Sequence, residues 1–66
     1  MTKEETLAFL EENGGIDIEC AKMQYEYMSD VYASVEDMIV DRIYGICRDK
    51  EVAKEVAKIL IKESEV

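Results

Sequence analysis

Apolar side chains recur every three or four residues from Ile18 to Ile46, and this regular spacing restricts the fold more than any other feature. Residues with this spacing lie on one side of an α-helix, because each helical turn holds about 3.6 residues. The chain contains no proline, and no glycine interrupts residues 18–44. The spacing therefore predicts one continuous helix over about residues 17–47, with Asp17 as its N-cap. Its inward face holds Ile18, Ala21, Tyr25, Met28, Tyr32, Val35, Ile39 and Ile46.

A break in this long helix is the alternative. Ser29-Asp30 and Ser34 are both suitable N-caps, so either place can start a new helix. A broken helix would allow a compact four-helix monomer. We prefer the continuous helix, because the apolar spacing keeps its phase across both places.

Two shorter helices are expected on either side. Thr2 and Glu5 have the spacing of a capping box, and the glycine pair after Asn13 favours a helix end, which predicts a helix at about residues 3–13. Asp49 is a suitable N-cap for a last helix at about residues 50–63, which should form an antiparallel hairpin with the long helix. The prediction is an all-α, three-helix chain with one helical domain over residues 1–66.

The length of the chain favours self-association. A 66-residue chain buries only about 60% of the surface that it exposes when unfolded. Two short helices would leave much of the long helix uncovered, so pairing the long helices of two copies would bury both apolar faces. We therefore expect a homodimer, with compact monomers as the alternative. The expected dimer-interface residues are Ile18, Tyr25, Met28, Tyr32, Val35, Ile39 and Ile46.

Composition excludes several classes of function. Histidine is absent, which removes imidazole bases and His-bearing zinc sites. Sixteen acidic residues against eight basic ones give a net charge of −8, which argues against direct binding to nucleic acid or an anionic membrane. The acidic start differs from a signal peptide, so a cytoplasmic protein is expected. Cys20 and Cys47 are expected to be buried free thiols, and we expect no enzyme activity, catalytic residue, metal or cofactor.

Acidic residues gather in the first part of the chain. Residues 1–41 hold eleven acids and two bases, whereas residues 42–66 hold five acids and six bases. On one continuous helix, five of these acids would form a strip on the side opposite to the apolar face, with outward apolar and aromatic residues around it. Such a strip is either a solvated helix back or a binding face for a basic protein. The candidate partner-binding residues are Glu19, Met23, Glu26, Tyr27, Asp30, Asp37, Val40, Asp41 and Tyr44.

Lysines recur every four residues near the end of the chain, at Lys50, Lys54, Lys58 and Lys62. Glu51 stands three residues before Lys54, and Glu55 stands three residues before Lys58, so local ion pairs and an ordinary solvated face are favoured over a phosphate-binding ridge. These lysines are also candidates for contact with acids of a second copy. Arg42 occupies a position where the repeat calls for an apolar residue, and we expect its stem to lie along the surface with its charge in solvent. The alternative is that Arg42 pairs with an acid across the dimer seam and sets its register.

These patterns favour a small acidic interaction protein with no enzymatic activity. Carboxylates on a helix face can take the place of nucleic-acid phosphates, so the expected partner is a basic, nucleic-acid-binding protein that is inhibited or regulated. Proteins that phages or mobile elements make against host defences would have this size and charge. The alternative is a homodimeric assembly or adaptor module that binds a partner helix through its exposed apolar positions, with the acids serving solubility. The dependence of partner affinity on salt distinguishes the two hypotheses. Binding through the acids should weaken steeply as ionic strength rises, whereas binding through apolar positions should not.

Overall fold

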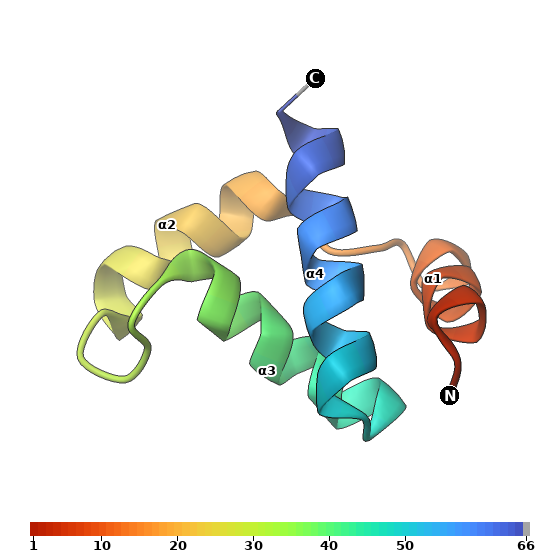
Figure 1. The fold of residues 1–66 in the computed structure, drawn as a ribbon. Coiled ribbons are helices and arrows are strands. Elements are labelled where there is room, and N and C mark those ends of the chain that lie inside the picture. Colours follow the sequence, from red (N-terminus) through yellow and green to blue (C-terminus); the bar gives the residue numbers. More distant parts are fainter. Residues whose placement is uncertain (66) are drawn as a thin grey trace.

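The computed structural model describes residues 1–65, and these residues form four α-helices (Figure 1). The all-α prediction is confirmed, whereas the predicted count of three helices is wrong, because the long central helix is two helices. Figure 1 shows α4 in the middle, with α1 on one side and α2 and α3 on the other. The helices are α1 (Lys3–Glu12), α2 (Ile18–Met28), α3 (Val35–Cys47) and α4 (Lys50–Ser64).

The capping box at the start of α1 forms as expected. The Glu5 N–H donates to the Thr2 hydroxyl over 3.1 Å, and the Thr2 N–H donates to the Glu5 carboxylate over 2.9 Å. The helix ends before Gly14 and Gly15, which have φ values of +87° and +70°. Glycine adopts this left-handed backbone without the strain that a Cβ atom causes. Both ends of α1 therefore follow from local sequence, and the predicted range of 3–13 is right to within one residue.

The predicted continuous helix over residues 17–47 is interrupted between Met28 and Val35. The N–H groups of Val31 and Tyr32 both donate to the Met28 carbonyl, over 2.9 and 3.1 Å, which closes a turn. The Tyr25 hydroxyl donates to the Ala33 carbonyl over 3.0 Å. These bonds satisfy backbone groups that a continuous helix would otherwise pair. The break proposed as the alternative is therefore the one that occurs.

Ser34 starts α3 as an N-cap. Its hydroxyl accepts a 3.1 Å hydrogen bond from the Asp37 N–H, which is one of the four N–H groups that a helix start leaves without a partner. Asp17 caps α2 in the same way, through the Cys20 N–H. Asp49 caps α4 by accepting from the N–H groups of Glu51 and Val52. Each cap is a residue type that the sequence marks as favourable at a helix start.

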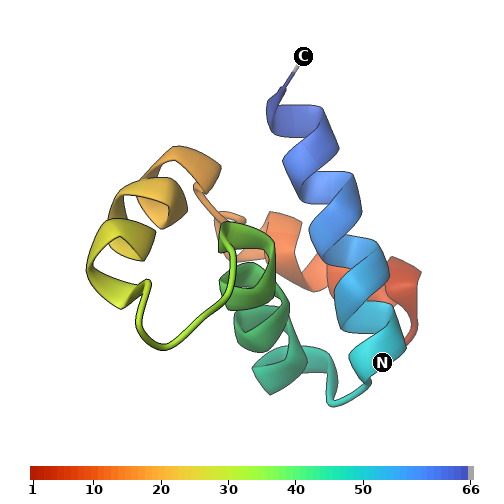
Figure 2. The same cartoon turned by 60° about the vertical axis from the view of Figure 1, so that its left-hand side comes forward.

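A tight turn joins α3 to α4, as the predicted hairpin requires. Arg48 adopts a left-handed backbone at φ 59°, and its N–H donates to the Tyr44 carbonyl over 2.9 Å. In Figure 2, α3 runs down to this turn and α4 runs up from it. Ala53 and Ala57 lie one turn apart on α4 and are fully buried, and such small side chains let a neighbouring helix approach closely.

The core lies where α2, α3 and α4 meet, with Leu10 added from α1. Burying one aliphatic side chain contributes roughly 1.5–3 kcal/mol, so a core of this kind supplies most of the driving force for folding. Thr6 is also fully buried, and its hydroxyl donates to the Thr2 carbonyl over 2.8 Å. The buried apolar residues are Leu10, Ile18, Ala21, Met38, Ile39, Val40, Ile43, Cys47, Ala53, Val56 and Ala57.

The face that was expected to need a second copy is covered largely within one chain. Ile18 and Ile39 are buried in the core, and Met28 is exposed. Tyr25, Tyr32, Val35 and Ile46 are half-buried and pack against the core. The argument for a homodimer depended on a long uncovered helix, and that helix does not form. The homodimer stays a prediction that sedimentation can test, but the uncovered long helix that suggested it is not present.

Arg42 joins the two halves of the broken helix. Its guanidinium donates to the Gln24 side-chain carbonyl on α2, and its side chain is exposed, as the sequence led us to expect.

Within residues 1–65, every helix is too short or too polar to cross a membrane.

Candidate protein-interaction surface

The break between α2 and α3 divides the predicted acidic strip. Glu19 and Glu26 lie on α2, Asp30 lies in the connecting turn, and Asp37 and Asp41 lie on α3. All five are exposed. They do not form one straight strip, because the two helices take different directions (Figure 1). The candidate residues therefore form two separate groups.

The first group lines a groove of about 500 Å³ between α3 and α4. Here the structure brings together four predicted residues, Asp37, Val40, Asp41 and Tyr44. Val40 was expected to point outward, and this prediction is wrong, because only 7% of its surface is exposed. The reason is that α3 packs closely against α4, so a side of α3 that a lone helix would expose is covered. Tyr44 keeps 39% of its surface exposed.

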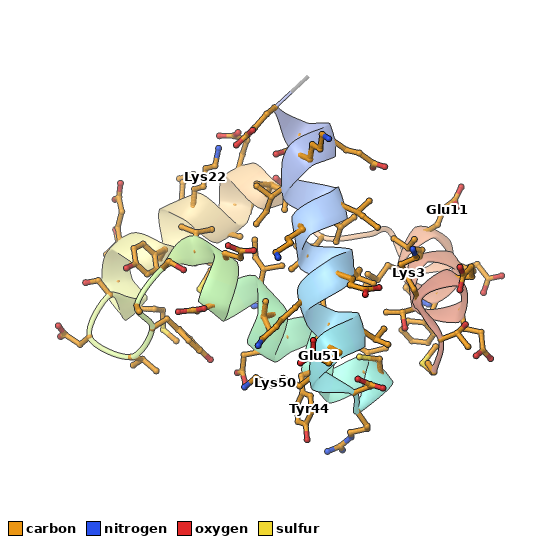
Figure 3. All side chains as sticks on the ribbon, in the orientation of Figure 1. Lys3, Glu11, Lys22, Tyr44, Lys50 and Glu51 are labelled. Atoms are coloured by element: carbon orange, nitrogen blue, oxygen red, sulfur yellow. The ribbon has the colours of Figure 1, made fainter. Side chains whose placement is uncertain are left out.

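Lysines of α4 form the opposite wall of this groove. Lys50, Lys54 and Lys58 line it together with the α3 carboxylates, and Figure 3 shows Lys50 and Tyr44 at the same end of the molecule. The expected local pairs of Glu51 with Lys54 and Glu55 with Lys58 do not form, since the one ion pair within 4.0 Å among residues 1–65 joins Lys22 to Glu19. The α3 carboxylates therefore face positive charge, which weakens this group as an acidic docking surface.

The facing acids and lysines of this groove have a counterpart in the sequence. Acidic residues of α3 and lysines of α4 both repeat at about one helical turn, and the short connection predicts that the two helices run in opposite directions. Together these observations would have placed the lysines of α4 opposite the acids of α3.

Tyr32 is a further residue of this groove, and sequence reasoning assigned it to a dimer interface. Its hydroxyl donates to the Asp41 carboxylate over 2.7 Å. This hydrogen bond to the carboxylate holds the proton on the phenol and so raises the pKa of Tyr32 above its ordinary value. The pair anchors the turn before α3 to the middle of that helix.

The second group lies on the outer side of α2. Tyr27 is 88% exposed and Met23 is 66% exposed, and with Cys20 and Gln24 they border a shallow hollow of about 260 Å³. These residues share one side of the helix because they are three or four positions apart. Val31, which follows in the turn, is 68% exposed. Large apolar side chains exposed in this way are typical of a contact surface.

Carboxylates flank this apolar ridge on one side. Glu19 and Glu26 are seven residues apart, so they fall about 20° short of two full turns and lie along the same edge of α2. Glu19 has Lys22 at 3.6 Å as an exposed partner, and exposed pairs of this kind are worth only about 0–1 kcal/mol. The edge therefore remains available to a basic group from a partner.

Cys20 differs from its prediction. Cys47 is buried as expected, but Cys20 is exposed at the start of α2. Its thiol donates to the Asp17 carboxylate over 3.3 Å. This hydrogen bond raises the pKa of the Cys20 thiol, so the reactive thiolate is disfavoured.

The described part of the chain, residues 1–65, contains no cluster of three Cys, Asp or Glu side chains arranged to hold a metal ion. What the surface does present is an exposed apolar ridge with an acidic edge on α2. No family model, curated protein or solved structure matches this chain.

Proposed function

We propose that the protein is a small interaction module that binds a basic partner protein through the outer face of α2. The observation that carries this proposal is the exposure of Met23 and Tyr27 beside the carboxylates of Glu19 and Glu26. Covering a side chain such as Met23 contributes roughly 1.5–3 kcal/mol, which gives a partner a hydrophobic anchor. The acidic edge then favours partners that carry lysine or arginine beside an apolar contact residue.

The α2 face is the stronger candidate of the two groups. In the α3–α4 groove, Asp37 and Asp41 share their surroundings with three lysines of α4. A basic partner would meet repulsion there as well as attraction. On α2, the basic residue Lys22 is paired with Glu19, and Glu26 and the nearby Asp30 have no lysine or arginine within 4.0 Å among residues 1–65.

The class of partner follows from the charge of the chain. A net charge of −8 attracts basic proteins over distances of about a Debye length, which is about 8 Å at physiological salt. Proteins that bind nucleic acid carry basic surfaces of this kind. Occupying such a surface would inhibit or regulate the partner, as an anti-defence protein of a phage or mobile element would do. This proposal requires neither catalysis nor a cofactor.

An adaptor module is the second candidate, favoured by the exposure of Tyr27, which at 88% is the highest among the large apolar and aromatic side chains of residues 1–65. In this case apolar packing against a partner helix supplies the affinity and the carboxylates serve solubility. The two candidates differ in how binding depends on salt and on Glu26.

Three matched variants test the proposal. Met23→Ser/Tyr27→Ser removes the ridge, Glu26→Gln/Asp30→Asn removes two charges beside it, and Glu11→Gln/Glu12→Gln removes two charges from the exposed end of α1. Each immobilised protein is offered cell lysate at about 0.1 M salt and washed at about 0.5 M, where screening shortens to a few ångströms. Circular dichroism confirms that each variant is folded.

The expected result is a basic protein that the wild type and the α1 variant capture equally, that both α2 variants lose, and that the high-salt wash releases. Capture that survives high salt and the Glu26→Gln/Asp30→Asn change, but fails without Met23 and Tyr27, would support the adaptor. Equal capture by all four proteins would overturn both.

A further inference from the structure

A second hollow, of about 370 Å³, opens where α2, the start of α3 and the end of α4 meet. Ile18, Val35 and Ile61 supply its apolar lining, one from each helix. Ile18 is buried, and the other two are half-buried. Its volume falls at the lower end of the roughly 300–1,000 Å³ of small-molecule pockets. The hollow therefore has the size for a small apolar group, and none of its residues belongs to the proposed α2 ridge.

Lysines surround this apolar lining. Lys22 comes from α2, and Lys58 and Lys62 come from α4. Figure 3 shows Lys22 on the side of α2 that lies toward the end of α4. Two carboxylates, Glu36 and Glu65, also line the hollow, and Lys22 is paired with Glu19 at 3.6 Å, so the charges at the hollow balance. In a chain with a net charge of −8, a balanced rim is less repulsive to an anion than the rest of the surface, and Lys58 and Lys62 supply its positive charge.

The α4 lysines are available to a ligand. Within the described residues, no carboxylate lies within 4.0 Å of Lys58 or Lys62. Lys58 also borders the α3–α4 groove with Asp37 and Asp41, whereas Lys62 lines only this hollow among the hollows described. Ser34 and Val35 at the start of α3 also line the hollow, and the positive end of the helix dipole there is partly offset by Glu36 and Asp37 in the first turn. An anionic group at the rim would thus meet the two exposed ammonium groups of Lys58 and Lys62.

We propose that this hollow binds a small amphipathic carboxylate, with an apolar chain against Ile18, Val35 and Ile61 and the carboxylate between Lys58 and Lys62. The apolar lining disfavours inorganic phosphate, which would leave the aliphatic surface exposed to water. The lysine ammonium groups can donate charge-assisted hydrogen bonds to a carboxylate, so they favour this ligand over an uncharged apolar molecule. A medium-chain fatty acid has both features.

The chain contains a natural comparison site. Another open apolar hollow, of about 460 Å³, lies between α1 and α4, where Leu7, Leu10 and Leu60 meet the carboxylates of Glu11 and Glu63. An apolar carboxylate would meet repulsion there. Binding at the proposed hollow but not at this second one would therefore show specific recognition, whereas a detergent-like molecule that attaches to any apolar surface would bind at both.

The test is a titration of the full chain with decanoate, followed through backbone amide signals in NMR spectra. Lys62→Gln removes a lysine that lines only the proposed hollow, whereas Lys54→Gln removes the same charge from the α3–α4 groove. We expect saturable shifts at residues 34–36 and 58–62. We expect Lys62→Gln to weaken binding by about fivefold, the size of one exposed ionic contact near 1 kcal/mol, while Lys54→Gln leaves it within about twofold.

A second variant and two further probes keep the outcome decisive. Ile61→Glu places a carboxylate in the hollow and should abolish the shifts, with circular dichroism confirming the fold. Inorganic phosphate and decanol should produce no saturable shifts at these residues. Equal binding of phosphate would identify a plain anion site, and equal binding of decanol would identify a merely apolar one. The proposal would be overturned by equal binding of phosphate or decanol. It would also be overturned if the two lysine variants weakened binding equally, or if decanoate produced matching shifts at Leu7 and Leu10.

Discussion

The Tyr32 hydroxyl donates a 2.7 Å hydrogen bond to the Asp41 carboxylate, and this contact joins the turn after α2 to the middle of α3. The Tyr25 hydroxyl holds the same turn from the other side, through the Ala33 carbonyl. Two tyrosines thus fix a connection that carries no glycine or proline. The position of α2, and with it the exposed ridge of Met23 and Tyr27, depends on this turn.

Tyr32 should ionise at a higher pH than an unperturbed tyrosine, because its hydrogen bond to Asp41 favours the protonated phenol. Since the pKa in the folded state is raised, this contribution to stability is complete below the ordinary value of 10.0 and is lost as the pH rises through the folded value. Spectrophotometric titration should show that Asp41→Ala moves the ionisation of Tyr32 to lower pH. Asp37→Ala, on the same helix, should leave the ionisation of Tyr32 where it is in the wild type; an equal shift in that control would refute the assignment.

Replacing Ser34 by alanine should lower the free energy of unfolding by about 1 kcal/mol, because the Asp37 N–H loses its cap. Urea denaturation of the two proteins measures this difference. Ser29→Ala is the matched control, since Ser29 follows α2 and caps no helix start, and its effect should stay within about 0.5 kcal/mol. Equal loss in both variants would show that Ser34 acts through something other than the cap.

Ile43→Ala should destabilise the protein by about 2–5 kcal/mol, because the side chain is fully buried and its removal leaves a cavity. A chain of 66 residues has little stability to spare, so the variant should melt at a much lower temperature or be unfolded at 25 °C. Val31→Ala removes part of a side chain that is 68% exposed and should change the melting temperature little. Calorimetry that finds similar losses would place Val31 in an interface between chains.

Acid should weaken the protein through its helix caps. Hydrogen bonds from Cys20 hold the pKa of Asp17 below its ordinary value of 3.8, so the contribution of Asp17 is present above that value and is lost as the pH falls through the lowered one. Asp17→Asn keeps a capping side chain that does not titrate. We expect the free energy of unfolding of the wild type to fall more steeply than that of the variant below about pH 4. Parallel curves would contradict this origin.

Glu5 should behave in the same way within the capping box of α1. The backbone hydrogen bond from Thr2 lowers its pKa from 4.5, so its contribution is lost as the pH falls through the lowered value. Glu5→Gln should flatten the acid limb of the stability curve in urea denaturation, whereas Glu4→Gln, which lies beside it without this bond, should not. An equal effect of the two substitutions would point to net charge as the cause.

Sequence alone determined the helical class, the apolar sides of the helices and the caps at Thr2, Asp17 and Asp49, because these depend on neighbours within one helical turn. Ser34 was recognised as a candidate cap, but local sequence could not decide whether it was used. The apolar repeat keeps its phase across residues 29–34, since both halves turn an apolar side toward the same core.

Tertiary structure decided the break, the burial of Val40 and the grouping of the candidate residues. A break costs helical hydrogen bonds, and a contact such as that of the Tyr25 hydroxyl with the Ala33 carbonyl, eight positions apart, satisfies a backbone group that the helix would have paired. Val40 is buried because α4 packs on α3, and Lys58 meets Lys22 around one hollow because α4 ends beside α2. Such relations depend on residues distant in the chain, and the periodicity within one helix does not say which other helix will cover a given side of it.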